Sequence, residues 1–402
     1  MTWQDDAARD LTSLGGRLAL LERGDGSVVW DAEGNRYLDF LGGIAVNSLG
    51  HSHPVFVTAV ADQAAVLSHV SNYFATPQQL QFAARLKRLA HTGESGRVFF
   101  ANSGSEANET AIKLARLHGG KYGKSTILSL NHAFHGRSTG SLALTPKAAY
   151  QDPFRPLLPG VEHIDNTIEA LEAAFTDDVA AIFIEPIQGE AGVVEHPEGF
   201  LRRARELATE HNALLIVDEV QTGTGRTGAW FAHQLYGVVP DAMTLAKGIA
   251  GGFPLAAMVT WGDASDLFYP GTHNSTFGGN PLATAVGNAV LAHIEDEDLL
   301  VNVRARGTEL RDAVQSLPLV TGTTGQGLLI GIHLAAPVAA EVRAAAHELG
   351  LIINAPTDDV IRIAPAFTTG DAEVAEFVDV FSRALATVIA AHPELAIEEN
   401  NS

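Results

Sequence analysis

Residues 213–228 read Ala-Leu-Leu-Ile-Val-Asp-Glu-Val-Gln-Thr-Gly-Thr-Gly-Arg-Thr-Gly. The run 213–217 is apolar without alternation, which is typical of a strand buried on both faces of a sheet. It ends in Asp218 and Glu219, and a glycine-rich turn follows. Because ligands of open α/β sheets bind at the carboxyl ends of strands, we expect Asp218 to face a crevice, where a carboxylate can pair with a protonated heterocycle. The alternative is an acid that only caps the following turn.

Strand and helix patterns alternate on both sides of this stretch. The other apolar strand candidates are 97–101, 126–130, 179–184, 242–245 and 255–260, and helical patterns cover 105–118, 167–175 and 199–211. This alternation predicts an α/β fold with a largely parallel central sheet and helices on both faces. A hairpin is expected over 27–40, and mixed helices and short strands follow residue 281, which predicts a smaller α+β domain. The expected division is an N-terminal segment 1–50 belonging to the small domain, a large domain 51–285, and a C-terminal small domain 286–402.

Composition excludes several classes of function. The 402 residues carry 26 basic and 47 acidic side chains, for a net charge of −21, which disfavours nucleic acid and anionic membrane surfaces as partners. Cysteine is absent, so disulfides, thiolate metal sites and thiol nucleophiles are excluded. The first residues show no signal peptide, and no apolar stretch approaches the roughly 20 residues of a membrane span, so we expect a cytoplasmic protein.

A lysine closes the next strand along the chain. Lys247 follows the apolar run 242–245 and precedes a glycine-rich bend. Desolvation at a buried strand end lowers the pKa of an amine, and a partly neutral amine is what Schiff-base formation requires. A lysine that only reaches to solvent is the alternative. Asp218 on the preceding strand favours the chemical interpretation, because a pyridoxal ring needs both groups.

Two further segments suit a phosphorylated planar ligand. Ser103 and Glu106 fit a capping box at the start of a helix, whose free N–H groups form an anion site. Phe134 is placed to stack on a ring, and Arg137 to bind a carboxylate. The neighbouring histidines lack a carboxylate at ligand spacing, so we expect them to be structural or to face solvent, and no metal site is predicted.

Gly223–Gly228 also matches the G-x-G-x-x-G pattern of dinucleotide-binding proteins. In that class the glycines follow a strand directly and open a helix, whereas here five residues intervene after the strand. An NAD-dependent oxidoreductase therefore remains an alternative with poor sequence context.

Taken together, these segments resemble the class III (ornithine-type) aminotransferases of pyridoxal-phosphate (PLP) fold type I, and among them the N-acetylornithine branch. The similarity runs from the 42–54 stretch to Ile361–Pro365. The resemblance implies PLP as the cofactor, N-acetylornithine and 2-oxoglutarate (or glutamate) as substrates within arginine biosynthesis, and a homodimer.

The resemblance also implies roles for individual residues. Lys247 corresponds to the Schiff-base lysine and proton carrier, and Asp218 to the partner of the ring nitrogen. The other cofactor contacts implied are the phosphate cradle Gly104 and Ser105, the stacking Phe134, Gln221 near the phenolic oxygen, and Thr276 reaching the phosphate from the second subunit. The implied substrate contacts are Arg137 and Ser275 for the N-acetylornithine end, Arg362 for the α-carboxylate of glutamate, and Glu190 as the acid that pairs with Arg362.

Two positions depart from the family pattern, since Ala191 and Ala256 stand where glycine is common. Ser105 replaces the more usual threonine but keeps the hydroxyl. Transamination of ornithine, succinylornithine or 4-aminobutyrate is the nearest alternative, because selectivity depends on pocket shape. A non-catalytic PLP-binding regulator is a third alternative, which the absence of a DNA-binding module disfavours.

Overall fold

The computed structural model describes residues 2–13 and 15–396, and its largest element is a central sheet. Within these residues the sheet has seven strands in the order β4-β12-β11-β10-β7-β5-β6. All run parallel except β12, which is antiparallel to both neighbours. The strands are β4 (Arg97–Ala101), β5 (Thr126–Leu130), β6 (Val161–Ile164), β7 (Val179–Ile184), β10 (Leu214–Asp218), β11 (Ala242–Leu245) and β12 (Ala256–Thr260). The predicted fold class is confirmed.

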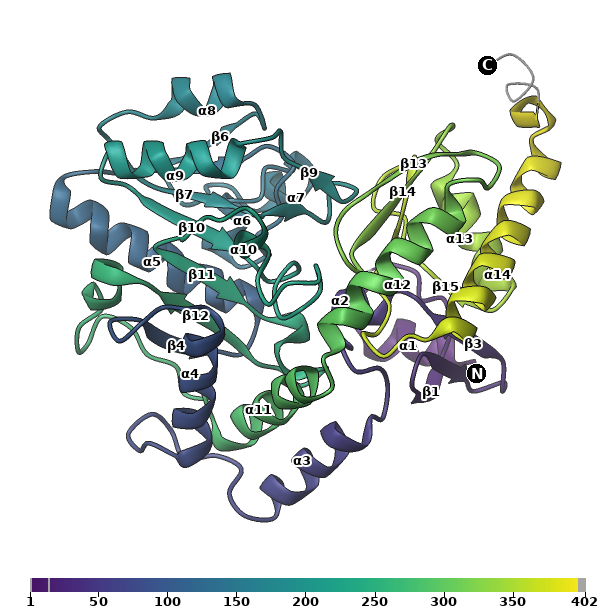
Figure 1. The fold of residues 1–402 in the computed structure, drawn as a ribbon, viewed down its shortest axis with the longest axis horizontal. Coiled ribbons are helices and arrows are strands. Elements are labelled where there is room, and N and C mark those ends of the chain that lie inside the picture. The colour runs from purple at the N-terminus through teal and green to yellow at the C-terminus, as the bar shows by residue number, and fades with distance from the viewer. Residues whose placement is uncertain (1, 14, 397–402) are drawn as a thin grey trace.

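Alternate residues of the central strands face two different helical layers. Ala181 and Phe183 of β7 pack with α5 (Gly104–Tyr122), whereas Ile182 and Ile184 pack with α9 (Phe200–Glu210). Burial on both faces explains why β7 and β10 read as continuous apolar runs. Figure 1 shows α9 and α8 (Ile168–Ala174) together on one side of the sheet.

A second group of elements lies beside the large sheet (Figure 1). It holds a three-stranded sheet of order β13-β14-β16 and a four-stranded sheet of order β1-β2-β3-β15. The strands are β1 (Leu21–Asp25), β2 (Val28–Asp31), β3 (Arg36–Asp39), β13 (Val320–Thr324), β14 (Ile330–Leu334), β15 (Leu351–Ile352) and β16 (Val360–Ile363). Because β15 pairs with β3, the N-terminal hairpin joins the C-terminal elements. The boundaries at residues 50 and 285 stay a prediction.

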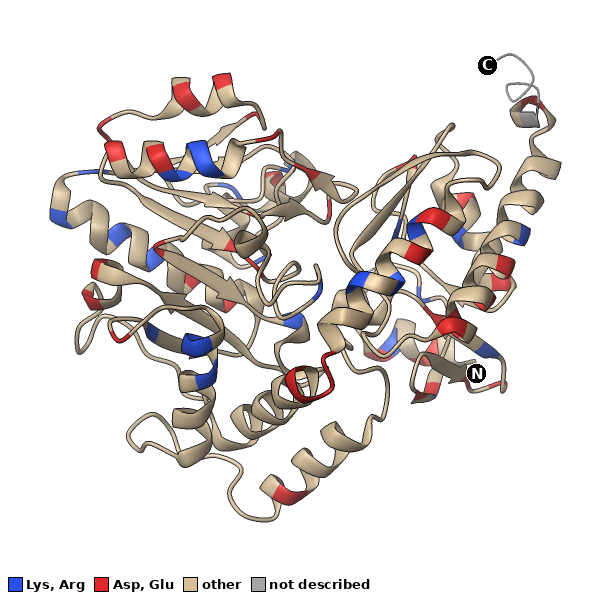
Figure 2. Ribbon diagram, in the orientation of Figure 1, with Lys and Arg blue, Asp and Glu red and all other residues tan. Residues whose placement is uncertain are grey.

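Helices connect and cover the two groups. They are α1 (Trp3–Asp10), α2 (Gly42–Ala45), α3 (Pro54–Ala64), α4 (Pro77–Leu89), α6 (Thr139–Ala143), α7 (Ala148–Gln151), α10 (Ala232–Leu235), α11 (Pro281–Asp296), α12 (Leu299–Val314), α13 (Ala339–Glu348) and α14 (Asp371–Ala391). Short 3-10 turns cover Asp152–Phe154, Lys247–Ala250, Gly262–Asp266 and Pro393–Ala396, and the two-residue strands β8 (Ile187–Gln188) and β9 (Val194–Glu195) pair with each other. No helix among the described residues has the length and apolarity to cross a membrane. Acidic and basic residues are interspersed along the helices of both groups (Figure 2).

Candidate active site

A cavity of about 400 Å³ opens where the carboxyl ends of β10 and β7 meet the start of α5. Seven predicted site residues line it: Gly104, Ser105, Phe134, Glu190, Asp218, Gln221 and Lys247. The rule that ligands bind at the carboxyl ends of parallel strands therefore holds here. Lys247 and Asp218, which we expected to act together, therefore line the same cavity.

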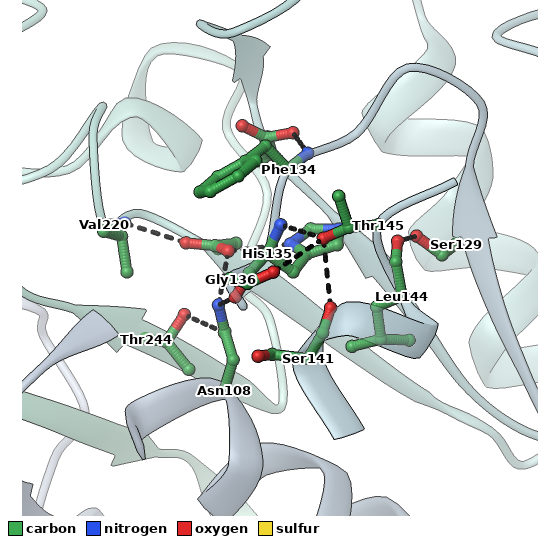
Figure 3. Close-up of polar contacts among 12 residues, drawn as sticks. Asn108, Ser129, Phe134, His135, Gly136, Ser141, Leu144, Thr145, Val220 and Thr244 are labelled. Carbon is green, nitrogen blue, oxygen red and sulfur yellow. Dashed lines mark hydrogen bonds and ion pairs between the residues drawn. The ribbon is translucent and has the colours of Figure 1, made fainter. Parts of the chain in front are cut away.

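Asp218 is the last residue of β10 and is only 3% exposed. Its Oδ2 accepts hydrogen bonds from Asn108 Nδ2 and His135 Nδ1, both at 2.7 Å, and its Oδ1 accepts one from the backbone N–H of Val220 at 3.0 Å (Figure 3). A buried carboxylate needs such partners to stay ionised. The capping alternative holds only in part, since a single contact goes to the following turn and the others orient the carboxylate.

The sequence reasoning missed Asn108 and His135. Asn108, on α5, also donates to the carbonyl of His135 and accepts from the hydroxyl of Thr244 on β11. Burial by itself would lower the pKa of His135, but the hydrogen bond and charge of Asp218 raise it. The prediction that these histidines are not metal ligands stays a prediction, and His135 is buried with its Nδ1 hydrogen-bonded to the candidate catalytic acid. A polar residue among alanines and other apolar residues near the start of α5 was the available signal for Asn108.

Lys247 begins the 3-10 turn that follows β11 and adopts a φ of 45°, in the left-handed region that non-glycine residues rarely occupy. Desolvation lowers the pKa of its amine to about 8, partly offset by the nearby charge of Glu190. In the part of the chain that the structure describes, no hydrogen-bond acceptor engages this amine. Strain and a free, partly neutral amine are both features of residues that form covalent bonds.

Glu185, at the end of β7, is a third carboxyl in the cavity that the sequence reasoning missed. Its Oε2 accepts the backbone N–H of Phe134 at 3.0 Å, which fixes the segment that carries the aromatic ring (Figure 3). Burial raises the pKa of Glu185 to about 7. Its position one residue after an all-apolar strand is the same signal that identified Asp218.

The start of α5 forms a cradle at the cavity wall. Ser103 Oγ accepts the N–H of Glu106, as predicted, but the Glu106 carboxylate binds the N–H of Asn102 and not that of Ser103. The predicted capping box is therefore only half formed, because the glutamate reaches one residue further back. The N–H groups of Gly104 and Ser105 lie in the first turn, where no intrahelical acceptor exists.

Close packing keeps this cradle open. A Cβ on Gly136 would lie 2.3 Å from Ser105 Oγ, and Gly136 has a φ of 133°. A Cβ on Gly104 would lie 2.9 Å from a methyl group of Val220. The features of the cavity fit PLP one by one. The helix start suits the phosphate, the Phe134 ring suits the pyridine ring, the Lys247 amine suits the aldehyde, and the buried Asp218 carboxylate suits the ring nitrogen.

Arg362, on β16, is 2% exposed and contacts two residues that line the cavity, Glu190 and Gln221. Its Nη1 contacts Glu190 Oε1 at 2.6 Å and Gln221 Oε1 at 3.2 Å, and its Nη2 donates to Asn354 Oδ1 at 2.8 Å. The charge of Arg362 lowers the pKa of Glu190 against the opposing effect of burial. The predicted pairing of Glu190 with Arg362 is present.

Besides Arg362, three other predicted residues, Arg137, Ser275 and Thr276, do not line the cavity. Arg137 is exposed and stacks on the Tyr150 ring at 3.4 Å, while its backbone N–H donates to Ser105 Oγ. Ser275 and Thr276 line a separate surface hollow with residues 71–73 and Asn274. Within one chain these two are not brought together with Lys247.

The geometry also removes the dinucleotide alternative. After β10 the chain makes turns through residues 220–230, and the next helix, α10, has only four residues. Each glycine of the pattern packs against other parts of the chain: Gly223 against Glu219, Gly225 against Leu300 and Phe367, and Gly228 against Arg304. The loop is therefore enclosed by protein. The loop does not open the long helix whose N-terminus binds the pyrophosphate in dinucleotide-binding proteins.

Comparison with known proteins agrees with this site. Residues 14–385 match the sequence profile of the family described as aminotransferase class-III. The acetylornithine aminotransferase of Streptomyces coelicolor is 50% identical over 362 residues, which are 89% of each chain. The chain therefore belongs to the class-III aminotransferases, and it is a PLP-dependent aminotransferase.

Two solved structures extend the comparison. N-acetylornithine aminotransferase from Stenotrophomonas maltophilia superposes with a TM-score of 0.84 at 36% identity, covering 96% of this chain and 100% of that one. A structure of Toxoplasma gondii ornithine aminotransferase, described with partial occupancy of PLP at its active site, gives a TM-score of 0.92 at 31% identity, covering 97% and 94%.

Proposed function

We propose that this protein transfers the side-chain amino group of N-acetylornithine to 2-oxoglutarate, giving N-acetylglutamate semialdehyde and glutamate, as a step of arginine biosynthesis. The observation that carries the proposal is the cavity that Lys247 and Asp218 both line, with Glu190 in its wall paired to Arg362. The similarity to acetylornithine aminotransferases along 89% of the chain supports the choice of substrate.

The cofactor, when bound, supplies a protonated ring that delocalises the electron pair left by removal of a proton from the substrate. Asp218 keeps the ring nitrogen protonated, and the Asn108 and His135 hydrogen bonds hold this carboxylate in place. Lys247 moves the proton at the reacting carbon, a task suited to an amine with a pKa of about 8. Phe134 would stack on the ring, Gln221 would lie near the phenolic oxygen, and Gly104 and Ser105 would hold the phosphate.

Two substrates of different charge use one site, which requires Arg362 to be available to only one of them. Glu190 neutralises Arg362 while N-acetylornithine is bound, and it moves aside when the α-carboxylate of 2-oxoglutarate or glutamate takes the guanidinium. The 2.6 Å contact and the partial exposure of Glu190 support this exchange. Arg137 contacts the N-acetylornithine end, and Ser275, which lies in the hollow away from the cavity of its own chain, does so from the second subunit of the dimer proposed below. Ala191 follows Glu190 directly, so this switch is where a departure from the family pattern bears most on selectivity.

We further propose a cytoplasmic homodimer in which Thr276 contacts the cofactor phosphate of the partner subunit. Large apolar side chains are exposed in the two segments that line the hollow or directly adjoin its lining residues: Tyr73, Phe74 and Phe277, with Tyr73 90% exposed. Exposed apolar surface of this extent is typical of a protein interface. Mixing Thr276→Ala with Lys247→Ala subunits tests it, because shared sites predict recovered activity in the mixed dimer.

The substrate assignment is tested by kcat/KM for N-acetylornithine, ornithine, succinylornithine and 4-aminobutyrate, each with 2-oxoglutarate. The proposal predicts the highest value for N-acetylornithine. A higher value for any of the other amines would overturn the assignment while leaving the enzyme class intact.

A further inference from the structure

His273 lies two residues before Ser275, on the segment 272–278 that borders the surface hollow. Its ring contacts two side chains of helix α5, with Lys113 Nζ 3.0 Å from Nδ1 and Thr110 Oγ1 3.1 Å from Nε2. Lys113 also donates to the carbonyl of Thr272 at 2.9 Å. Three polar contacts therefore join this segment to the helix whose first turn forms the phosphate cradle.

The hydrogen-bond partners fix the protonation of the ring. An ammonium has no acceptor, so Lys113 donates to Nδ1, which must carry a lone pair. The Thr110 hydroxyl donates to the carbonyl of Glu106 at 2.9 Å, so it accepts from Nε2–H of His273. The imidazole is therefore neutral, with its proton on Nε2.

The surroundings of the ring agree with a neutral imidazole. Phe99 of β4 stacks on it at 4.8 Å, and Phe268 stacks at 6.0 Å. Helix α5 presents the charged group Lys113 to the His273 ring. The other two packed elements, β4 and the segment before residue 269, present the aromatic rings of Phe99 and Phe268. Burial first, and then the Lys113 charge, lower the pKa of His273.

We infer that His273 is a positioning residue, which fastens the segment 272–278 to α5 and so presents Ser275 and Thr276 at a fixed place. The consequence for the cofactor rests on the proposed function, in which Thr276 reaches the phosphate of the partner subunit. The fastening itself does not depend on that function. With this fastening, the single helix α5 supports both the phosphate cradle of its own subunit and the segment 272–278 that reaches the partner subunit in the proposed dimer.

The test is hydrogen–deuterium exchange in residues 269–279 of the PLP-loaded protein, together with the dissociation constant for PLP. His273→Phe keeps the aromatic stacking and removes both hydrogen bonds, so exchange should rise about tenfold. His273→Gln retains an N–H donor and should show a smaller rise, and Thr110→Val should raise exchange without touching the segment. The matched control is His333→Phe, which removes a similar contact, 2.9 Å to Thr324, in the three-stranded sheet.

Unchanged exchange in His273→Phe and Thr110→Val would overturn the inference. Raised exchange with PLP affinity weakened about tenfold supports both the inference and the cross-subunit contact. Raised exchange with unchanged PLP affinity supports the fastening and contradicts the proposed role of Thr276, so the two claims fail separately.

Discussion

Replacement of Asp218 by asparagine separates the chemical role of this carboxylate from its structural one. The side chain receives two donors at Oδ2, from Asn108 and His135, and one at Oδ1, from Val220. An amide has one oxygen and one NH₂ group, so in either orientation its NH₂ faces at least one of these donors. One buried unsatisfied donor costs about 1–3 kcal/mol, which a chain of this size tolerates.

The effect on the rate should be much larger. A carboxylate and a cation about 3 Å apart attract by about 5 kcal/mol at an effective dielectric constant of about 20. Loss of that attraction leaves the ring nitrogen unprotonated, so proton removal from the substrate should slow by roughly 10³–10⁴-fold. Single-turnover absorbance changes after addition of N-acetylornithine measure this step directly.

Asp241→Asn is the matched control. Asp241 precedes β11, and its Oδ2 accepts from Arg205 and from the N–H of Leu215, both at 2.7 Å, away from the cavity. This variant should lose similar stability in urea unfolding and keep its rate. A folded Asp218→Asn protein that reacts at the wild-type rate would refute the assignment of Asp218.

Three other variants test neighbouring parts of the site. Glu185→Gln should change the pH dependence of stability, because the Glu185 carboxyl has a pKa of about 7 in the folded protein against a usual 4.5. The stabilisation by this carboxyl is present below pH 4.5 and is lost as the pH rises to 7. In urea unfolding of the cofactor-free protein, the wild type should therefore lose on the order of 3 kcal/mol relative to the variant across that window. An equal pH dependence would contradict the buried, neutral carboxyl. In Arg362→Lys a single ammonium cannot replace the contacts that two separate guanidinium nitrogens make, so KM for 2-oxoglutarate should rise roughly 10–100-fold, with a smaller change in KM for N-acetylornithine. Unchanged KM values for both substrates would count against the proposed role of Arg362. Gly136→Ala places a methyl group against the hydroxyl oxygens of Ser105 and Ser141. We expect the free energy of unfolding to fall by about 1–3 kcal/mol and PLP binding, measured by titration, to weaken. Wild-type affinity for PLP would show that the cradle can relax.

Much of the fold was predictable because the central strands are buried on both faces. The bounds of β4, β5, β7 and β11 agree with the sequence patterns. β6 was missed because Val-Glu-His-Ile at 161–164 lacks an apolar run, as befits an edge strand that pairs only with β5. β1, with the sequence Leu-Glu-Arg-Gly-Asp, was missed for the same reason.

The candidate site was predictable where a residue ends a buried strand, as Asp218 does, or follows one, as Lys247 does. Asn108 and His135 were not, because their importance arises from contacts between positions far apart in the sequence, 110 and 83 residues from Asp218. The half-formed capping box has a similar cause, since Asn102 offers two donors that compete for Glu106.

The central claim is that Lys247 is the residue that binds the cofactor in the cavity it shares with Asp218. Borohydride reduction of the PLP-loaded protein, followed by peptide mapping with mass spectrometry, locates the modified lysine. The account predicts a reduced pyridoxyl group on Lys247 alone, with the label and the visible absorbance lost in Lys247→Ala. A label on any other lysine in the loaded wild-type protein would contradict it.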